Sequence, residues 1–300
     1  MKKLRVGILF GGRSSEHQIS LLSVKNVVSS IDRKLFDPIL IAIDRDGVWH
    51  YHGESLSFIH ADDPKNIELD QLGTKVILSH NDHSLIEVES FRSMGQIDLL
   101  YPVLHGTYGE DGSVQGLAKL AKIPCVGCGI LGSAVGMDKD IMKKILRDGG
   151  IGIADFFTLR KESAKNATYE KIVEKLGNEL FVKPANLGSS VGVSLTKSEE
   201  EFNKALEEAF SYDRKVIVEE KIVGREIEVA VMGNDSPIAS VPGEIIPKSG
   251  WYSFENKYVD EDGAALGIPA DLDDETTRRM MSAAVEAYTL LELSGLTRVD

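Results

Sequence analysis

The sequence predicts a soluble protein that combines an α/β part with an α+β part, about two domains in all. The chain opens with an apolar run, a glycine pair and an amphipathic stretch, which is the pattern of a β-α-β unit. A second apolar run, Leu180–Pro184, leads into a glycine- and serine-containing loop within a stretch of alternating predicted strands and helices. The 300 residues are 42% hydrophobic and 27% charged, which is enough for more than one core.

The first predicted strand is Leu4–Phe10, which stops at a glycine pair. A helix follows, and Ser15 and Gln18 have the spacing of a capping box at its start. Pro38–Asp44 is the second strand, and ligands are expected near the ends of such strands. The sequence contains neither G-x-G-x-x-G nor G-x-x-x-x-G-K-[ST], so it predicts neither a dinucleotide fingerprint nor a Walker-type loop.

Polar side chains follow two predicted strands of this part. Glu16 falls in the first helical turn, where the helix dipole stabilises a carboxylate; alternatively, it lies at the mouth of the sheet and binds an ammonium group. The buried strand Ile97–Leu104 leads into His105–Gly112, which contains three glycines with His, Glu and Asp. This composition favours a substrate-binding loop over a simple turn. Residues 47–93 contain short strand-like pieces that we expect to extend the same domain.

The cysteines and histidines do not indicate a redox or metal site. Cys125 and Cys128 form one C-x-x-C with no second pair, so we interpret both as small buried residues rather than a redox pair or half a zinc site. Four histidines are interpreted as surface residues: His50, His52, His80 and His83.

The second part begins after the glycine-rich stretch 127–132. We expect one helix, Ser133–Asp148, with mostly solvated lysines. Further elements follow at these positions: strand Phe156–Leu159, a helix around Thr168–Leu176, strands Leu180–Pro184 and Val193–Leu195, a helix capped by Ser198 with Glu201 at the box position, strand Lys215–Glu220, helix Asp273–Leu293 and strand Leu296–Asp300.

The loop after Leu180–Pro184 has the composition of an anion site. Its glycines let the backbone approach a ligand, its serines provide donors, and Lys183 supplies a positive charge at a strand end. Glycine and serine are also the usual residues of a hairpin turn, so the loop alone leaves both interpretations open.

Seven segments, taken in order, resemble the D-alanine–D-alanine ligase family of the ATP-grasp superfamily. They are GILFGGRSSEHQISLLS, LHGTYGEDGSVQG, MDKD, FVKPANLGSSVGVS, VEEKIVGREIEVAV, ENKY and GLTRVD. The resemblance implies an ATP-grasp fold preceded by a Rossmann-like domain. It divides the chain into an N-terminal substrate domain (1–129), a central ATP-grasp domain (130–222) and an incomplete C-terminal ATP-grasp domain (223–300).

The resemblance also implies roles for matching residues. Those that match the nucleotide site are the phosphate-binding lysines Lys139, Lys183 and Lys257, the closing loop Gly188, Ser189, Ser190, Val191 and Gly192, and the adenine and ribose segment Glu220, Lys221, Val223 and Glu226. Those that match the amino-acid and metal sites are Glu16 for the ammonium of the first D-alanine, Ser189 and Tyr258 in support of it, His105 near the reacting groups, Arg298 for the transferring phosphoryl and Asp300 for Mg²⁺ or Mn²⁺, of which two ions are expected.

The function implied by the resemblance is ATP-dependent joining of two D-alanines through D-alanyl phosphate, for peptidoglycan precursors, by a cytoplasmic homodimer. Tyr258 after ENK favours an amine acceptor over D-lactate. The alternatives are a D-alanine–D-lactate type or other carboxylate–amine ligase, a non-catalytic nucleotide-binding module and, from the opening β-α-β unit alone, a nicotinamide oxidoreductase. Family members continue beyond the position of Asp300 with further metal ligands, so we expect these 300 residues alone to be inactive.

Composition excludes two classes of partner. The net charge of −13, without a lysine or arginine run, argues against binding nucleic acid. The sequence has no apolar run of about eighteen residues, which argues against a membrane span.

Overall fold

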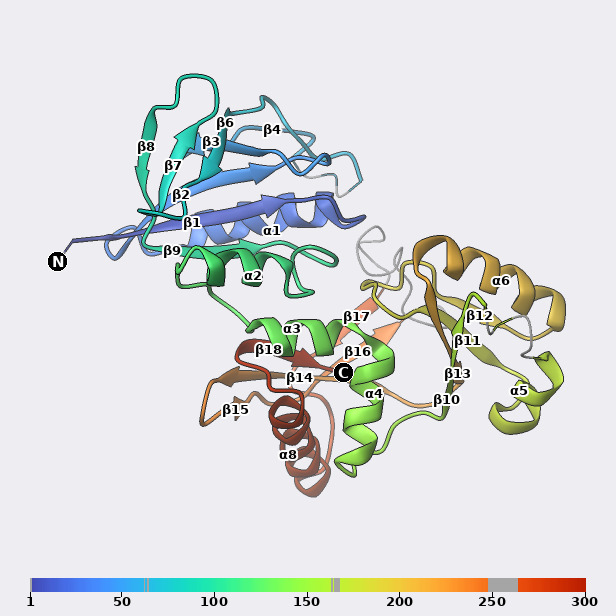
Figure 1. The fold of residues 1–300 in the computed structure, drawn as a ribbon. Helices are drawn as coiled ribbons and strands as arrows, with labels where there is room; N and C mark the ends of the chain where they lie inside the picture. The colour runs from blue at the N-terminus through green and yellow to red at the C-terminus, as the bar shows by residue number, and fades with distance from the viewer. Residues whose placement is uncertain (1, 62, 64, 163, 165–167, 248–263) are drawn as a thin grey trace. The chain divides into compact units, whose positions relative to one another are not determined.

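The computed structural model describes residues 2–300 except 62, 64, 163, 165–167 and 248–263 (Figure 1). The chain forms two compact units, Met1–Ser133 and Ala134–Asp300. The finer division into three domains stays a prediction. In the described part of the chain, no helix combines the length and apolar character that crossing a membrane requires.

A seven-stranded sheet forms the centre of the first unit (Figure 1). Strand β1 (Leu4–Gly11), next to the edge, pairs in parallel with both of its neighbours, while the other pairings in the sheet are antiparallel. The segment 47–93 therefore extends the sheet, as expected. In spatial order the strands are β8 (Ser93–Gln96), β7 (Ser84–Glu87), β6 (Thr74–Leu78), β3 (Trp49–Gly53), β2 (Phe36–Ile43), β1 (Leu4–Gly11) and β9 (Leu99–Val103); β4 (Phe58–Ile59) and β5 (Glu68–Leu69) pair separately.

Strand β1 is buried on both faces, which explains its continuous apolar sequence. Ile8 and Phe10 belong to the core that contains Leu21 of helix α1 (His17–Ser30). Leu9 belongs to the opposite core, which contains Val114 of α2 (Ser113–Leu120). The two helices therefore contribute to different cores at this sheet.

Three expectations for the first unit are wrong. The capping box of Ser15 and Gln18 does not form, because Glu16 is the N-cap residue of α1 and its backbone N–H donates to Ser14 Oγ at 3.1 Å. His50 is buried rather than at the surface, and its Nε2 lies 2.9 Å from Asp44 Oδ2. Both residues of the C-x-x-C motif, Cys125 and Cys128, are half-buried free thiols rather than fully buried side chains.

The described part of the second unit contains two sheets. The first has the order β10-β13-β11-β12, is antiparallel throughout, and shares a core with helices α5 and α6. Ser198 caps α6 as predicted, since its Oγ accepts from the Glu201 N–H at 3.3 Å. These elements are β10 (Phe156–Arg160), α5 (Tyr169–Leu176), β11 (Leu180–Pro184), β12 (Ser194–Thr196), α6 (Glu199–Tyr212) and β13 (Lys215–Glu220).

In the other sheet, β14 pairs with β15, β16 and the last strand, β18. Helix α8 packs against β14, and Val231 and Tyr288 lie in their shared core. The elements are β14 (Glu226–Gly233), β15 (Ile238–Ala239), β16 (Gly243–Pro247), β17 (Ala264–Gly267), α8 (Asp274–Leu290) and β18 (Gly295–Val299).

The prediction of one helix over Ser133–Asp148 is wrong. The structure has two helices, α3 (Ile130–Met137) and α4 (Lys139–Asp148). Asp138 between them has an extended backbone conformation, and its carboxylate accepts from the N–H groups of Asp140 and Ile141. A new helix therefore begins at Lys139.

Candidate active site

The first group of candidate residues lies where β1 turns into α1. Gly11 and Gly12 have φ of +85° and +92°, and a Cβ on Gly11 would lie 2.5 Å from the Ile43 carbonyl oxygen. The Gly12 N–H donates to that same oxygen at 2.7 Å. Only glycine suits this turn, which brings the start of α1 to the end of β2.

The Glu16 side chain is buried and tightly packed at the end of β1. It is 4% exposed, and a Cβ on Gly106 would come within 2.3 Å of its Oε2. Ser14 Oγ donates to the His105 carbonyl oxygen at 2.7 Å, which joins the loop after β1 to the loop after β9. Glu16 and His105, far apart in sequence, are thus brought into one site.

His105 is expected to be neutral at this site. Burial lowers the pKa of the imidazole, and this effect outweighs the negative charge of Glu16, which acts in the opposite direction. Its Nε2 lies 2.8 Å from Ser23 Oγ on α1. A neutral imidazole adds no positive charge that would repel an ammonium ion beside the Glu16 carboxylate.

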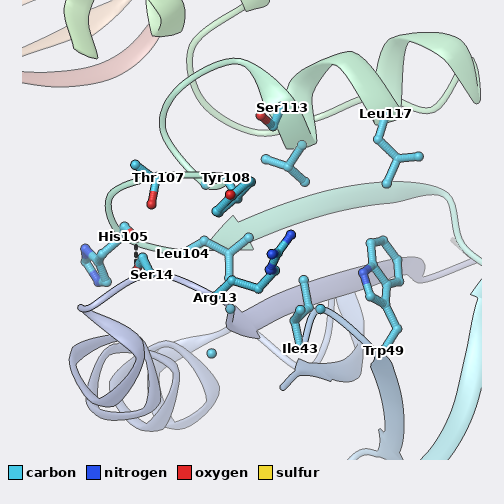
Figure 2. A pocket seen from close by; sticks show the side chains of 15 residues that line it. Arg13, Ser14, Ile43, Trp49, Leu104, His105, Thr107, Tyr108, Ser113 and Leu117 are labelled. Atoms are coloured by element: carbon cyan, nitrogen blue, oxygen red, sulfur yellow. Dashed lines mark hydrogen bonds between the residues drawn. The ribbon is translucent and has the colours of Figure 1, made fainter. Parts of the chain in front are cut away.

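A pocket of about 200 Å³ opens beside these loops (Figure 2). Ile43, Trp49 and Leu104 form part of its apolar wall. The Arg13 guanidinium lies 4.8 Å from the centre of the Tyr108 ring, and both side chains line the pocket. The strand ends therefore carry a concave surface of mixed polarity, as is usual for small-molecule sites.

The second group of candidates surrounds a buried carboxylate, Glu219 on β13. Lys183 Nζ lies 2.6 Å from its Oε2, and Lys143 Nζ lies 3.2 Å from its Oε1. Burial would raise the pKa of Glu219, but the charges of the two lysines keep it below its usual value. Lys143 is buried as well, so the expectation that the α4 lysines are mostly solvated is wrong for this one.

Lys139 adds a third ammonium group to this cluster. Its backbone N–H donates to the Ala185 carbonyl oxygen at 3.0 Å, and its Nζ donates to the carbonyl oxygen of Leu187. Burial, together with the nearby charge of Lys183, lowers its pKa to about 8. Two ammonium groups therefore contact Glu219 and the third lies within reach of its charge, a concentration of positive charge suited to a polyphosphate.

The glycine-serine loop follows β11, the strand that carries Lys183. Strands β11 and β12 form an antiparallel hairpin with this loop at its tip, so the hairpin interpretation is confirmed. The loop also lies at the lysine cluster, because Leu187 accepts from Lys139. Ser189 and Ser190 have φ of +49° and +60°, which is uncommon for residues other than glycine. A hairpin and an anion site are therefore compatible here.

The remaining candidates lie elsewhere in the second unit. Glu220 Oε1 accepts from the Asp155 N–H at 2.7 Å, and Lys221 Nζ lies 2.9 Å from Glu179 Oε2. Val223 is exposed. Glu226 begins β14, Gly188, Val191 and Gly192 belong to the loop, and Lys257 and Tyr258 lie outside the described residues.

Arg298 and Asp300 lie at the end of the chain beside β14. The Arg298 guanidinium contacts both Asp300 oxygens, at 2.6 and 2.9 Å, and lies 3.1 Å from Glu228 Oε1. No group of three His, Cys, Asp or Glu side chains suited to a metal occurs among the described residues. Asp300 can contribute one carboxylate oxygen to a magnesium ion that arrives with nucleotide phosphates, and such an ion needs further ligands besides this one.

Sequence reasoning did not select Glu219 or Lys143. Glu219 stands out in one respect, as a carboxylate that directly follows the apolar residues of KVIVEE. The pairing register explains its position, since Glu219 is opposite Phe181 on β11, beside Lys183.

Comparison with known proteins identifies the family. Residues 5–128 match the model of the D-ala D-ala ligase N-terminus, and residues 145–300 match that of the C-terminus. The chain belongs to the D-alanine–D-alanine ligase family. It is 49% identical to a D-alanine–D-alanine ligase of Shouchella clausii (strain KSM-K16), covering 100% of this chain and 82% of the relative. The identity to D-alanine–D-alanine ligase A of Escherichia coli (strain K12) is 47%, covering 100% and 83%.

Solved structures of this ligase family have the same fold. The D-alanine–D-alanine ligase of Coxiella burnetii superimposes with a TM-score of 0.81 at 34% identity, covering 99% of this chain and 81% of that one. The VanG D-Ala:D-Ser ligase of Enterococcus faecalis gives 0.82 at 34% identity, covering 99% and 85%. The predicted ATP-grasp ligase fold is confirmed.

Proposed function

We propose that the protein uses ATP to join two D-alanines through a D-alanyl phosphate, as a step toward peptidoglycan precursors. Family membership supports the reaction class. The observation that carries the proposal for this chain is the cluster of Lys139, Lys143 and Lys183 around Glu219, at the start of the glycine-serine loop. This surplus of positive charge beside a small-residue loop suits a triphosphate.

Each part of the site has a task in this proposal. Glu16 binds the ammonium group of the first D-alanine, beside the neutral His105. Lys139 and Lys183 bind the phosphates, and their charge stabilises the negative charge that moves during phosphoryl transfer. Arg298 offers its guanidinium to the transferring phosphoryl. The amine of the second D-alanine then attacks the acyl phosphate, and phosphate leaves.

Other assignments support this chemistry. Gly188–Gly192, with Ser189 and Ser190, closes over the phosphates, which keeps water from the acyl phosphate. Glu220, Lys221, Val223 and Glu226 hold the adenine and ribose. Asp300 contributes one carboxylate to magnesium, which neutralises phosphate charge when bound. Lys257 and Tyr258 are assigned to phosphate and substrate in the same way, and we propose a cytoplasmic homodimer.

The second substrate is the part of the proposal most open to an alternative. One structural neighbour is a D-Ala:D-Ser ligase, so D-serine is a specific competitor as acceptor. D-Lactate tests the ester-forming alternative. We propose D-alanine as the preferred acceptor.

Phosphate release tests the function directly. In the longest natural form of the chain, we expect ATP hydrolysis to depend on D-alanine, to be slower with D-serine or D-lactate as the second substrate, and to be absent with L-alanine. Mass spectrometry of the product is expected to show the D-alanine dipeptide. Release that is independent of the amino acid would contradict the proposal, while ATP protection against unfolding without turnover would favour a nucleotide-binding module.

Raising the pH from about 7 to about 9.5 is expected to weaken ATP binding about tenfold, because Lys139 loses its proton in this range. The pKa of Lys139 is lowered to about 8, so the free protein holds it charged below that pH and neutral above it. Titration with a fluorescent ATP analogue measures the effect. Lys139→Arg stays charged throughout, so this variant should lose most of the pH dependence of ATP affinity. If affinity falls with pH equally steeply in the wild type and in Lys139→Arg, the role of Lys139 is refuted.

A further inference from the structure

A buried polar network in the second unit has no task in the chemistry above. Lys215, the first residue of β13, is only 5% exposed. Its Nζ lies 2.6 and 2.5 Å from the two carboxylate oxygens of Asp138 and 3.3 Å from Asp140 Oδ2. Asp140 Oδ1 also accepts from Thr158 Oγ1 at 2.6 Å and lies 2.7 Å from Lys144 Nζ. Two carboxylates and two ammonium groups thus balance each other.

The pKa of Asp140 reflects this balance of positive and negative charges. Its burial would raise the pKa, but hydrogen bonds from Lys144 and Thr158 and the charge of Lys215 hold the pKa below its usual value. Such a network gives little net stability compared with well-packed apolar side chains, since both charges must be desolvated. It does fix geometry, because each member has several directed contacts. The segments that the network holds in place therefore indicate what the network does.

Lys215 connects two segments that meet at the phosphate site. Its side chain holds Asp138, whose carboxylate caps α4 and so sets where Lys139 begins the helix. Its backbone carbonyl accepts from the Ala185 N–H at 2.9 Å, and the Ala185 carbonyl accepts from the Lys139 N–H at 3.0 Å. One residue thus ties the start of α4 to the segment that leads into the glycine-serine loop.

A neighbouring carboxylate strengthens this connection. Asp213 Oδ1 accepts from the Lys215 N–H at 3.1 Å, and its Oδ2 accepts from the backbone and side-chain nitrogens of Asn186 at 2.9 and 2.8 Å. The next residue, Leu187, accepts from Lys139 Nζ. The positions of Lys139 and of the loop entrance are therefore determined by the same few contacts.

We propose that Lys215 is a positioning residue for ATP: through Asp138 it holds the Lys139 ammonium at the entrance of the glycine-serine loop. This proposal rests on the proposed function, because it assigns Lys139 to the phosphates. A purely structural role for Lys215 is the competing explanation. In that case, substituting Lys215 would lower the stability of the fold without changing how a folded molecule binds nucleotide.

Lys215→Met tests the proposal, because methionine keeps most of the length of the side chain and removes its charge. Nucleotide affinity is measured with a fluorescent ATP analogue at a temperature at which circular dichroism shows the variant folded. We expect a loss of about 10- to 100-fold, the size of effect that follows from displacing a binding group by about 1 Å. If Lys215→Met does not fold, Asp138→Asn is tested instead, because asparagine keeps an acceptor for capping α4. We expect this variant to lose less nucleotide affinity.

Two control variants separate positioning from stability. Leu176→Ala removes a buried side chain from the core formed by α5, α6 and the sheet, and should lower the unfolding midpoint with nucleotide affinity within about twofold. Lys144→Met removes the half-exposed cation of the network without touching Asp138, and should also retain affinity. If Leu176→Ala loses as much affinity as Lys215→Met, Lys215 acts only through stability.

Chemical labelling of Lys139 gives a readout that does not need nucleotide. Its modification by an amine-reactive reagent, followed by mass spectrometry across pH, reports its protonation. In the wild type, half-maximal reactivity is expected near the pKa of about 8. Lys215→Met should raise that pH, because a displaced ammonium becomes more hydrated. An unchanged profile would overturn the positioning role, whereas a wild type that binds no ATP would instead refute the proposed function.

Discussion

Replacing Lys183 by methionine is expected to lower kcat/KM for ATP by about 100- to 1000-fold, the usual effect of removing one preorganised charged donor from a phosphoryl-transfer site. The fold should survive the change. The Lys183 side chain is 24% exposed at the end of β11, and Glu219 keeps Lys143 as its partner when Lys183 is removed. The loss should therefore appear in steady-state kinetics and in nucleotide affinity, with little shift in the unfolding midpoint.

Lys197→Met is the matched control for this experiment. Lys197 follows β12, the partner strand of β11, but its side chain is 62% exposed and pairs with Glu179 at 2.8 Å. Glu179 retains Lys221 in this variant. We expect kinetics within about twofold of the wild type, because an exposed ion pair contributes little. Equal losses in the two variants would mean that overall charge, rather than a phosphate contact, explains the effect of Lys183.

The sequence predicted well those elements whose cause is local. Leu180–Pro184 and Lys215–Glu220 have the predicted bounds, because short apolar runs between turn residues leave little alternative to a buried strand. The cap of α6 was also predictable, since Ser198 and Glu201 carry the signal within four residues. Prediction of the strands placed Glu16 and Lys183 at strand ends, where ligand-binding residues are usual.

The errors fall where distant residues decide the outcome. The break at Asp138 between α3 and α4 is accompanied by an ion pair with Lys215, which lies 77 positions away in the sequence. His50 is buried because Asp44 accepts its hydrogen bond, and alternation along β3 alone did not reveal that partner. Periodicity describes how a segment faces a core, but it does not identify the polar partner that a buried side chain will find.

The candidate site shows the same limit. Lys183 was chosen from its own segment, whereas Glu219 and Lys143 become recognisable only when β11, β13 and α4 are paired and packed. The anion-binding role of Lys183 and the ammonium-binding alternative for Glu16 came from the pattern, whereas the roles of most other matching residues came from the family resemblance. They remain proposals that substitutions must test.

Glu16→Gln is expected to raise KM for the first D-alanine by about tenfold, because a charge-assisted hydrogen bond of about 1.5–3 kcal/mol is replaced by a neutral one of about 0.5–1.5 kcal/mol. Glutamine has the same shape, so the close contact with Gly106 should persist and the fold should remain. ATP affinity should change less than twofold, since the proposal assigns the phosphates to the lysine cluster and not to Glu16. Initial rates at varied D-alanine, with a separate nucleotide titration, measure the two effects.

The control for Glu16→Gln is Glu54→Gln, which removes one negative charge from the same unit at an exposed side chain, 3.7 Å from Arg33. Its kinetics should be those of the wild type. If Glu16→Gln instead lowers kcat for ATP turnover while KM for D-alanine stays constant, Glu16 does not bind the ammonium group. If Glu16→Gln weakens the use of D-alanine and ATP equally, the buried Glu16 carboxylate has a structural role at the N-terminus of α1, because a helix N-terminus also stabilises a carboxylate. The separate effects on D-alanine and ATP therefore decide between the two interpretations that the sequence left open for this residue.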